Sequence, residues 1–203
     1  MEVRWLAVSL LVASCSSDNS VVFVTRTEYG GDLKTFGGEP TGLESADGLC
    51  MLEARAAELR GSFRAWLSSS TVNAIDRIVD ASPWDMVGGT TVFENLDALA
   101  AGPSAGITRD QFGKEVVVMF GLPVWTGTLS AGTTSQYTCM DWTNALCSPR
   151  RADQLDQVPA ADPNTGSIGA GGDKAGAWTY GNGCIGTCPM TARLYCFEQP
   201  PGS

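Results

Sequence analysis

TGLESADGLCMLEARAAELRG, residues 41–61, has the pattern of an amphipathic helix with a defined start and end. Thr41 and Glu44 form a capping box, in which each side chain can bond a free backbone N–H of the first turn. Apolar side chains then recur at spacings of three or four, which places them on one helix face: Leu43, Ala46, Cys50, Ala54 and Ala57. Gly61 follows, where helices commonly end. The pattern predicts a helix with Cys50 on its buried face.

Short runs rich in β-branched or aromatic residues, or with alternating apolar residues, predict strands before and after this helix. Residues 21–27 (VVFVTRT) precede it, residues 62–67 (SFRAWL) follow it, and residues 193–198 (RLYCFE) lie near the end of the chain. Residues 114–120 and 124–128 predict two more strands. A few strands mixed with a few helices indicate the α+β class.

The other segments have weaker patterns. Residues 71–79 predict a second helix, and residues 92–101 predict a strand or a short helix. Residues 148–180 are polar and rich in Gly, Asp and Pro, so we expect a long loop-rich region there.

Composition excludes several classes of function. The chain has 203 residues, a formal net charge of −9 and no histidine. Without histidine, Ser-His-Asp and Cys-His catalysis are impossible, and the commonest metal ligand is missing. An acidic chain also repels phosphates, so we expect no nucleic-acid partner and no binding to anionic lipid surfaces.

Cys15 ends a short apolar run, LVASC at residues 11–15, which is typical of a lipoprotein signal. This predicts a signal peptide at 1–14, lipidation of Cys15, a short tether at 15–20 and one domain at 21–199. The alternatives are an ordinary secretory signal or a start further upstream. Ser16 stands where Asp would retain a lipoprotein at the inner membrane. We therefore expect an exported protein held by lipid at the outer membrane or cell surface.

Six cysteines follow Cys15. An even number in an exported chain predicts three disulfides, although spacing alone cannot choose among the fifteen pairings. Cys184 and Cys188 also have a spacing loosely compatible with zinc. Export to an oxidising compartment and the lack of histidine favour disulfides over that alternative.

Four segments in order resemble the endostatin domain, the C-terminal module of collagens XV and XVIII, which has a C-type-lectin-like fold. They lie at residues 45–69 (with SADGLC and LRGSFRAWLSS), 124–127 (VWTG), 137–142 (YTCMDW) and 188–198 (ending in LYCFE). The chain is also similar to bacterial lipoprotein and surface domains of this fold, whose function is unassigned. The resemblance covers most of residues 43–198 and implies a single disulfide-stapled α+β domain with a long loop-rich region.

The resemblance also implies a disulfide pairing. It implies two nested bridges, Cys50–Cys196 and Cys139–Cys188. The two remaining cysteines, Cys147 and Cys184, would then form a third bridge. The main alternative exchanges partners between the last two pairs.

The large aromatic side chains divide into two groups. Trp66, Trp125 and Trp142 stand beside predicted strands and cysteines, so we expect them in the core. Trp178 and Tyr180 stand in the polar glycine-rich region, where packing gives less reason for large rings. We therefore predict Trp178 and Tyr180 as candidate ligand-binding residues.

The chain departs from the patterns of endostatin and of calcium-dependent lectins at their metal and heparin sites. Trp142-Thr143-Asn144 lacks the aspartate that completes a calcium-lectin motif, and the zinc histidines of endostatin are absent. Arginines match basic family positions, but the net charge argues against heparin binding: Arg55, Arg60 and Arg64. We expect no metal and no cofactor. The open alternative is calcium bound by loop aspartates: Asp153, Asp156, Asp162 and Asp173.

These observations favour a noncatalytic, surface-anchored binding or adhesion module. Its partner would be an extracellular glycan or protein, met through the long-loop face. One alternative is a structural module that binds another envelope protein. The other is a carboxylate-based hydrolase, which needs two paired carboxylates and no histidine.

Overall fold

The computed structural model of the protein describes residues 19–116, 122–144, 165–170, 178–179 and 185–203. Within them the fold is α+β, as predicted, with one mixed sheet of five strands and a smaller sheet of three. Cys15, Cys147, Cys184, Tyr180 and the four loop aspartates lie outside the described residues.

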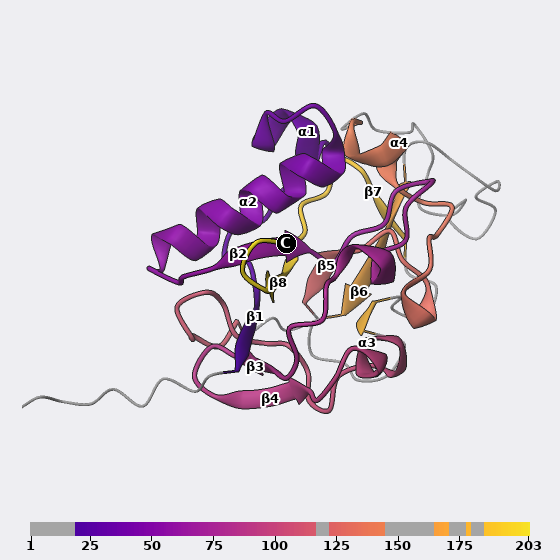
Figure 1. Ribbon diagram of the computed structural model, residues 1–203. Helices are drawn as coiled ribbons and strands as arrows, with labels where there is room; N and C mark the ends of the chain where they lie inside the picture. The colour runs from indigo at the N-terminus through magenta and orange to yellow at the C-terminus, as the bar shows by residue number, and fades with distance from the viewer. Residues whose placement is uncertain (1–18, 117–121, 145–164, 171–177, 180–184) are drawn as a thin grey trace, which may run out of the picture.

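The five-stranded sheet brings distant parts of the chain together (Figure 1). Strand β1 pairs with β3 in parallel and with β8 antiparallel, while β2 and β4 form the two edges. In sheet order the strands are β2 (Ser62–Ala65), β8 (Tyr195–Gln199), β1 (Ser20–Val24), β3 (Trp84–Met86) and β4 (Thr90–Phe93). The last strand thus lies between two strands from the first third of the chain.

The remaining elements surround this sheet. The antiparallel three-stranded sheet has the order β5 (Pro123–Trp125), β6 (Thr165–Ala170) and β7 (Ile185–Thr187). The helices are α1 (Leu33–Gly37), α2 (Gly42–Ala56), α3 (Asp97–Ala101) and α4 (Cys139–Trp142), with 3-10 turns at Ile75–Arg77 and Ser130–Gly132. No helix in the described part of the chain has the length and apolar composition needed to cross a membrane.

The longest helix forms as its sequence predicts. Both halves of the capping box are present: Thr41 Oγ1 accepts the Glu44 N–H at 3.2 Å, and Glu44 Oε2 accepts the Thr41 N–H at 3.1 Å. The helix ends at Ala56, with Ala57 as its C-cap. Its predicted inner face is buried at Ala46, Cys50 and Ala54.

Other predicted elements differ from the structure. The helix predicted at 71–79 is wrong, because Ser69 Oγ accepts the backbone N–H groups of Thr71 and Val72 and forms a local turn. A single 3-10 turn at Ile75–Arg77 remains. Residues 92–101 contain both a strand end and a helix. In the loop-rich region, β6 is an unpredicted strand.

The strand predicted at 114–120 does not form over its described part. Within residues 114–116, Glu115 makes an isolated bridge to Arg109.

Two hydrophobic clusters make up the core. Cys196 belongs to the cluster below α2, whereas its neighbours Tyr195 and Phe197 belong to the other. Because side chains alternate along a strand, the two clusters lie on opposite faces of the five-stranded sheet. The predicted core residues Trp66, Trp125 and Trp142 are confirmed as fully buried.

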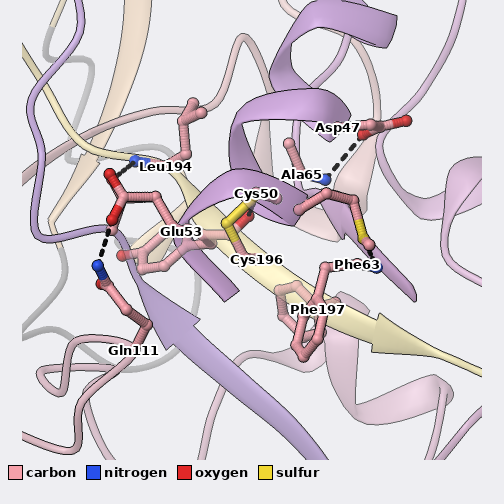
Figure 2. The surroundings of a disulfide bond; sticks show 12 residues. Asp47, Cys50, Glu53, Phe63, Ala65, Gln111, Leu194, Cys196 and Phe197 are labelled. Atoms are coloured by element: carbon pink, nitrogen blue, oxygen red, sulfur yellow. Dashed lines mark hydrogen bonds between the residues drawn. A yellow bond between two sulfur atoms is a disulfide. The ribbon is translucent and has the colours of Figure 1, made fainter. Parts of the chain in front are cut away.

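Two disulfides tie this architecture together. Cys50 of α2 bonds Cys196 of β8, and Cys139 of α4 bonds Cys188, the two pairs that the resemblance implies. The alternative partner for Cys139, Cys184, is therefore excluded in this structure. Figure 2 shows the first bridge between the helix and the strand, close to Phe197.

A buried polar contact also holds α2 to the loops around it. Glu53 accepts the Tyr29 hydroxyl at 2.7 Å. It also accepts the amide N–H of Gln111 (Figure 2). Burial raises the pKa of Tyr29, and the hydrogen bond to Glu53 acts in the same direction, so the phenol stays neutral. All three side chains are buried, and Glu53 bonds both of the others, which gives them a structural role in the fold.

Glu198 gives the first testable prediction, a pH dependence of stability. Burial raises the pKa of Glu198, and its hydrogen bond from the Val21 N–H only partly offsets this. A raised native pKa favours the protonated form, so this group's contribution to stability falls as pH rises through that pKa. We therefore expect E198Q to gain stability relative to wild type between pH 4 and 7.

The gain should stay below about 1 kcal/mol, because solvent screens a partly exposed charge. Guanidinium unfolding at four pH values measures it, and E94Q, at an exposed glutamate, serves as the control. Parallel pH curves for wild type and E198Q would contradict the prediction.

Candidate functional site

Trp178 does not lie on the surface, and the structure corrects its prediction as a ligand-binding residue. Its side chain is 1% exposed. The ring centroid lies 4.8 Å from that of Trp66, 5.3 Å from Phe93 and 5.4 Å from Tyr195. The polar residues next to Trp178 in sequence gave no sign that it is buried. Its burial comes from residues far away in sequence that surround the ring.

A hollow lined by five charged side chains lies elsewhere, at the N-terminal end of α2. We call it the polar cleft; its volume is about 460 Å³. Its walls are the first turns of α2, the 69–72 turn and α4, which lie at the same side of the molecule in Figure 1. It is lined by Thr41, Gly42, Leu43, Glu44, Asp47, Arg64, Ser69, Thr71, Val72, Arg77 and Asp141.

An ion pair forms the floor of the polar cleft. Arg77 Nη2 donates to both carboxylate oxygens of Asp47 at 2.7 Å, and Asp47 Oδ1 also accepts the Ala65 N–H at 2.9 Å. Burial raises the pKa of Asp47, while the Arg77 guanidinium and the Ala65 N–H oppose that rise. Both oxygens of this carboxylate are therefore engaged by the protein itself.

Arg64 stands beside this pair and is less constrained. Its Nη1 donates to the Arg77 carbonyl at 2.8 Å, and within the described residues it forms no ion pair. It is therefore a charged donor at the edge of the polar cleft. In the sequence, Arg64 is notable only for its resemblance to a basic position of endostatin, which does not indicate this environment.

The opposite wall is an unusual backbone turn. All four residues of α4, which contain no glycine, have positive φ: Cys139 at 49°, Met140 at 52°, Asp141 at 55° and Trp142 at 65°. Left-handed backbone costs such residues about 1–2 kcal/mol each, so the surroundings must hold it. Conformations of this kind cluster at ligand-binding and active sites.

Several bonds hold this turn in place. The Cys139–Cys188 disulfide ties down its start, and the Trp142 indole N–H donates to the Ser68 carbonyl at 2.7 Å. Asp141 accepts the Ser70 N–H at 2.6 Å and the Ser70 hydroxyl at 2.7 Å. The carboxylate of Asp141 is thereby fixed at the mouth of the polar cleft.

Gly42 lets α2 approach this turn closely. A Cβ atom at Gly42 would overlap the Asp141 carbonyl oxygen and lie 2.5 Å from Trp142 Cβ. Gly48, in the same helix, has open space instead, with its nearest neighbour at 3.9 Å. Gly42 and Gly48 therefore form a matched test and control for substitution by alanine.

We expect G42A to destabilise the protein by about 2 kcal/mol, because the backbone contact cannot yield without moving α4. G48A should instead be neutral or stabilising by up to about 1 kcal/mol, through helix propensity alone. Chemical unfolding of both variants measures the difference. Equal effects at the two positions would contradict the close packing of α2 against α4.

No metal site emerges from the described residues. Among them, no three His, Cys, Asp or Glu side chains gather as a metal-binding group. The aspartates of the calcium alternative lie outside the described residues, so that alternative stays untested.

Comparison with known proteins gave no relatives: no family model matches the chain, and no curated protein matches its sequence.

Proposed function

We propose that the protein is a noncatalytic binding module whose recognition surface is the polar cleft. Its partner is an extracellular glycan or protein, and its fold is the endostatin-like, C-type-lectin-like one. Lipid at Cys15 holds it at the outer membrane or cell surface, with a domain at 21–199. The observation that carries the proposal is a polar cleft framed by a left-handed turn without glycine.

The chemistry of the polar cleft suits hydroxyl-rich ligands. Sugar hydroxyls both donate and accept hydrogen bonds, so they pair with carboxylates and with guanidinium and hydroxyl donors. Glu44 supplies an acceptor through Oε1, Arg64 and Thr71 supply donors, and Val72 adds an apolar contact with 36% of its surface exposed. The Glu44 side chain is held by Thr41, and the Arg64 side chain is held by the Arg77 carbonyl, which lowers the entropy cost of binding.

The state of Asp47 supports a binding role over hydrolysis. A general acid or nucleophile must have an oxygen available to the substrate. Both Asp47 oxygens instead accept hydrogen bonds from Arg77. The raised pKa of this carboxyl follows from burial, which also accompanies a structural ion pair.

A broad glycan array, probed with the oxidised protein in calcium and in chelator, tests this proposal. T71W should abolish selective signal, because it places a large ring at an exposed position in the polar cleft. T90W is the matched control, since Thr90 is exposed at the start of β4 and away from the cleft.

Wild-type signal that T71W leaves intact would contradict the assignment of the polar cleft. A blank array would reject the glycan form of the proposal and leave a protein partner. Signal lost in chelator would place calcium in the binding site.

A further inference from the structure

A second hollow lies between α1 and the outer side of α2, with a volume of about 390 Å³. We call it the apolar groove, after the two exposed apolar side chains in its lining, Phe36 and Leu52. It shares no lining residue with the polar cleft. Its lining includes the residues from which the interface is argued below: Phe36, Glu39, Gly48, Met51, Leu52 and Arg55. Phe36 is 55% exposed and Leu52 is 61% exposed, so two large apolar side chains meet solvent here.

The apolar groove follows one stripe of α2. Gly48, Met51, Leu52 and Arg55 are spaced i, i+3, i+4 and i+7, so they lie along one helix face. The opposite face of α2, with Ala46 and Cys50, is already buried in the core. On this outer face Leu52 is exposed, whereas Met51 is half-buried against the core. With Phe36 of α1, Leu52 forms a small exposed apolar surface, and exposed apolar surfaces mark interaction sites.

Opposite charges stand at the two ends of this groove. Glu39 lies at the Gly48 end, where a Cβ on Gly48 would be 3.9 Å from Glu39 Cγ. Arg55 lies two turns further along α2, at a rise of about 10 Å. Both side chains are exposed, and neither forms an ion pair within the described residues.

We propose that the apolar groove is the interface of a symmetric homodimer. A two-fold axis through the middle of the stripe runs the two α2 helices antiparallel, so each surface meets a copy of itself. Glu39 then faces the partner's Arg55, and Arg55 faces the partner's Glu39. Leu52 and the exposed part of Met51 lie near the axis.

A second copy fits better than other occupants because the charge pattern is self-complementary. A groove with one anion and one cation at opposite ends matches its own two-fold image, whereas an anionic lipid surface would repel Glu39. The net charge of −9 opposes self-association at long range, but physiological salt screens it beyond about 8 Å. The proposal does not rest on the polar cleft.

Sedimentation equilibrium of the oxidised protein in physiological salt tests this interface. Wild type should show a concentration-dependent mass that approaches twice that of one chain. R55E and E39R should each be monomeric at the same concentrations, because like charges would then face each other twice. An equimolar mixture of the two variants should dimerise, because every facing pair is then of opposite sign.

R60E, at an exposed arginine outside the apolar groove, is the control and should dimerise like wild type. Circular dichroism establishes that each variant is folded. A wild type that stays monomeric up to about 1 mM would overturn the proposal. So would dimers that survive R55E, or a mixture that fails to restore association.

Discussion

The double variant C50A/C196A is expected to lose about 5 kcal/mol of unfolding free energy. The bond joins residues 146 positions apart, and in the chain-entropy model a crosslink that closes so long a loop removes a large part of the unfolded-state entropy. Both cysteines are fully buried between α2 and β8, so the change also removes core contacts (Figure 2). Guanidinium unfolding of the oxidised proteins measures the loss.

The second disulfide provides the control. C139A/C188A opens a bridge of sequence separation 49, for which the same model gives about 4 kcal/mol. The Cys50–Cys196 variant should therefore be the less stable of the two. A loss below about 2 kcal/mol for C50A/C196A would show that native packing holds α2 to β8 without the bond.

W178A is expected to cost about 4 kcal/mol of stability, because it removes a fully buried indole. The ring contacts Trp66, Phe93, Tyr195 and Phe197, so no single neighbour can close the cavity. W178F retains an aromatic ring and should lose much less. Thermal and chemical unfolding of the two variants measure this difference.

This result also separates the two roles considered for Trp178. If the ring served a ligand at the surface, W178A would keep its stability and lose binding. A variant as stable as wild type would therefore contradict the core position and restore the original prediction.

Local chemistry explains which elements could be predicted. The α2 helix follows from the Thr41–Glu44 capping box and a regular apolar face, both of which act within a few residues. Strand β8 follows from an apolar run with two aromatic residues, Tyr195 and Phe197, in the same way. The disulfide pairs needed a resemblance to a known family, because cysteine spacing alone leaves the pairing open.

The polar cleft could not be predicted, because its walls come from parts of the chain far apart in sequence. Ser70 and Asp141 meet across 71 positions through hydrogen bonds that no local pattern indicates. The left-handed turn at Cys139–Trp142 contains no glycine to signal positive φ. The Ser69 hydroxyl accepts the Thr71 N–H, so residues 69–72 form a turn although the sequence pattern predicts a helix over 71–79. Thr71 therefore lines the cleft.

The role of the polar cleft is decided by calorimetric titration of T71W and W178F with the glycan that gives the strongest array signal. T71W should bind at least about tenfold more weakly than wild type, because its new ring occupies the cleft. W178F should bind like wild type, because Trp178 lies in the core. Unchanged binding by T71W together with lost binding by W178F would contradict the proposed recognition surface.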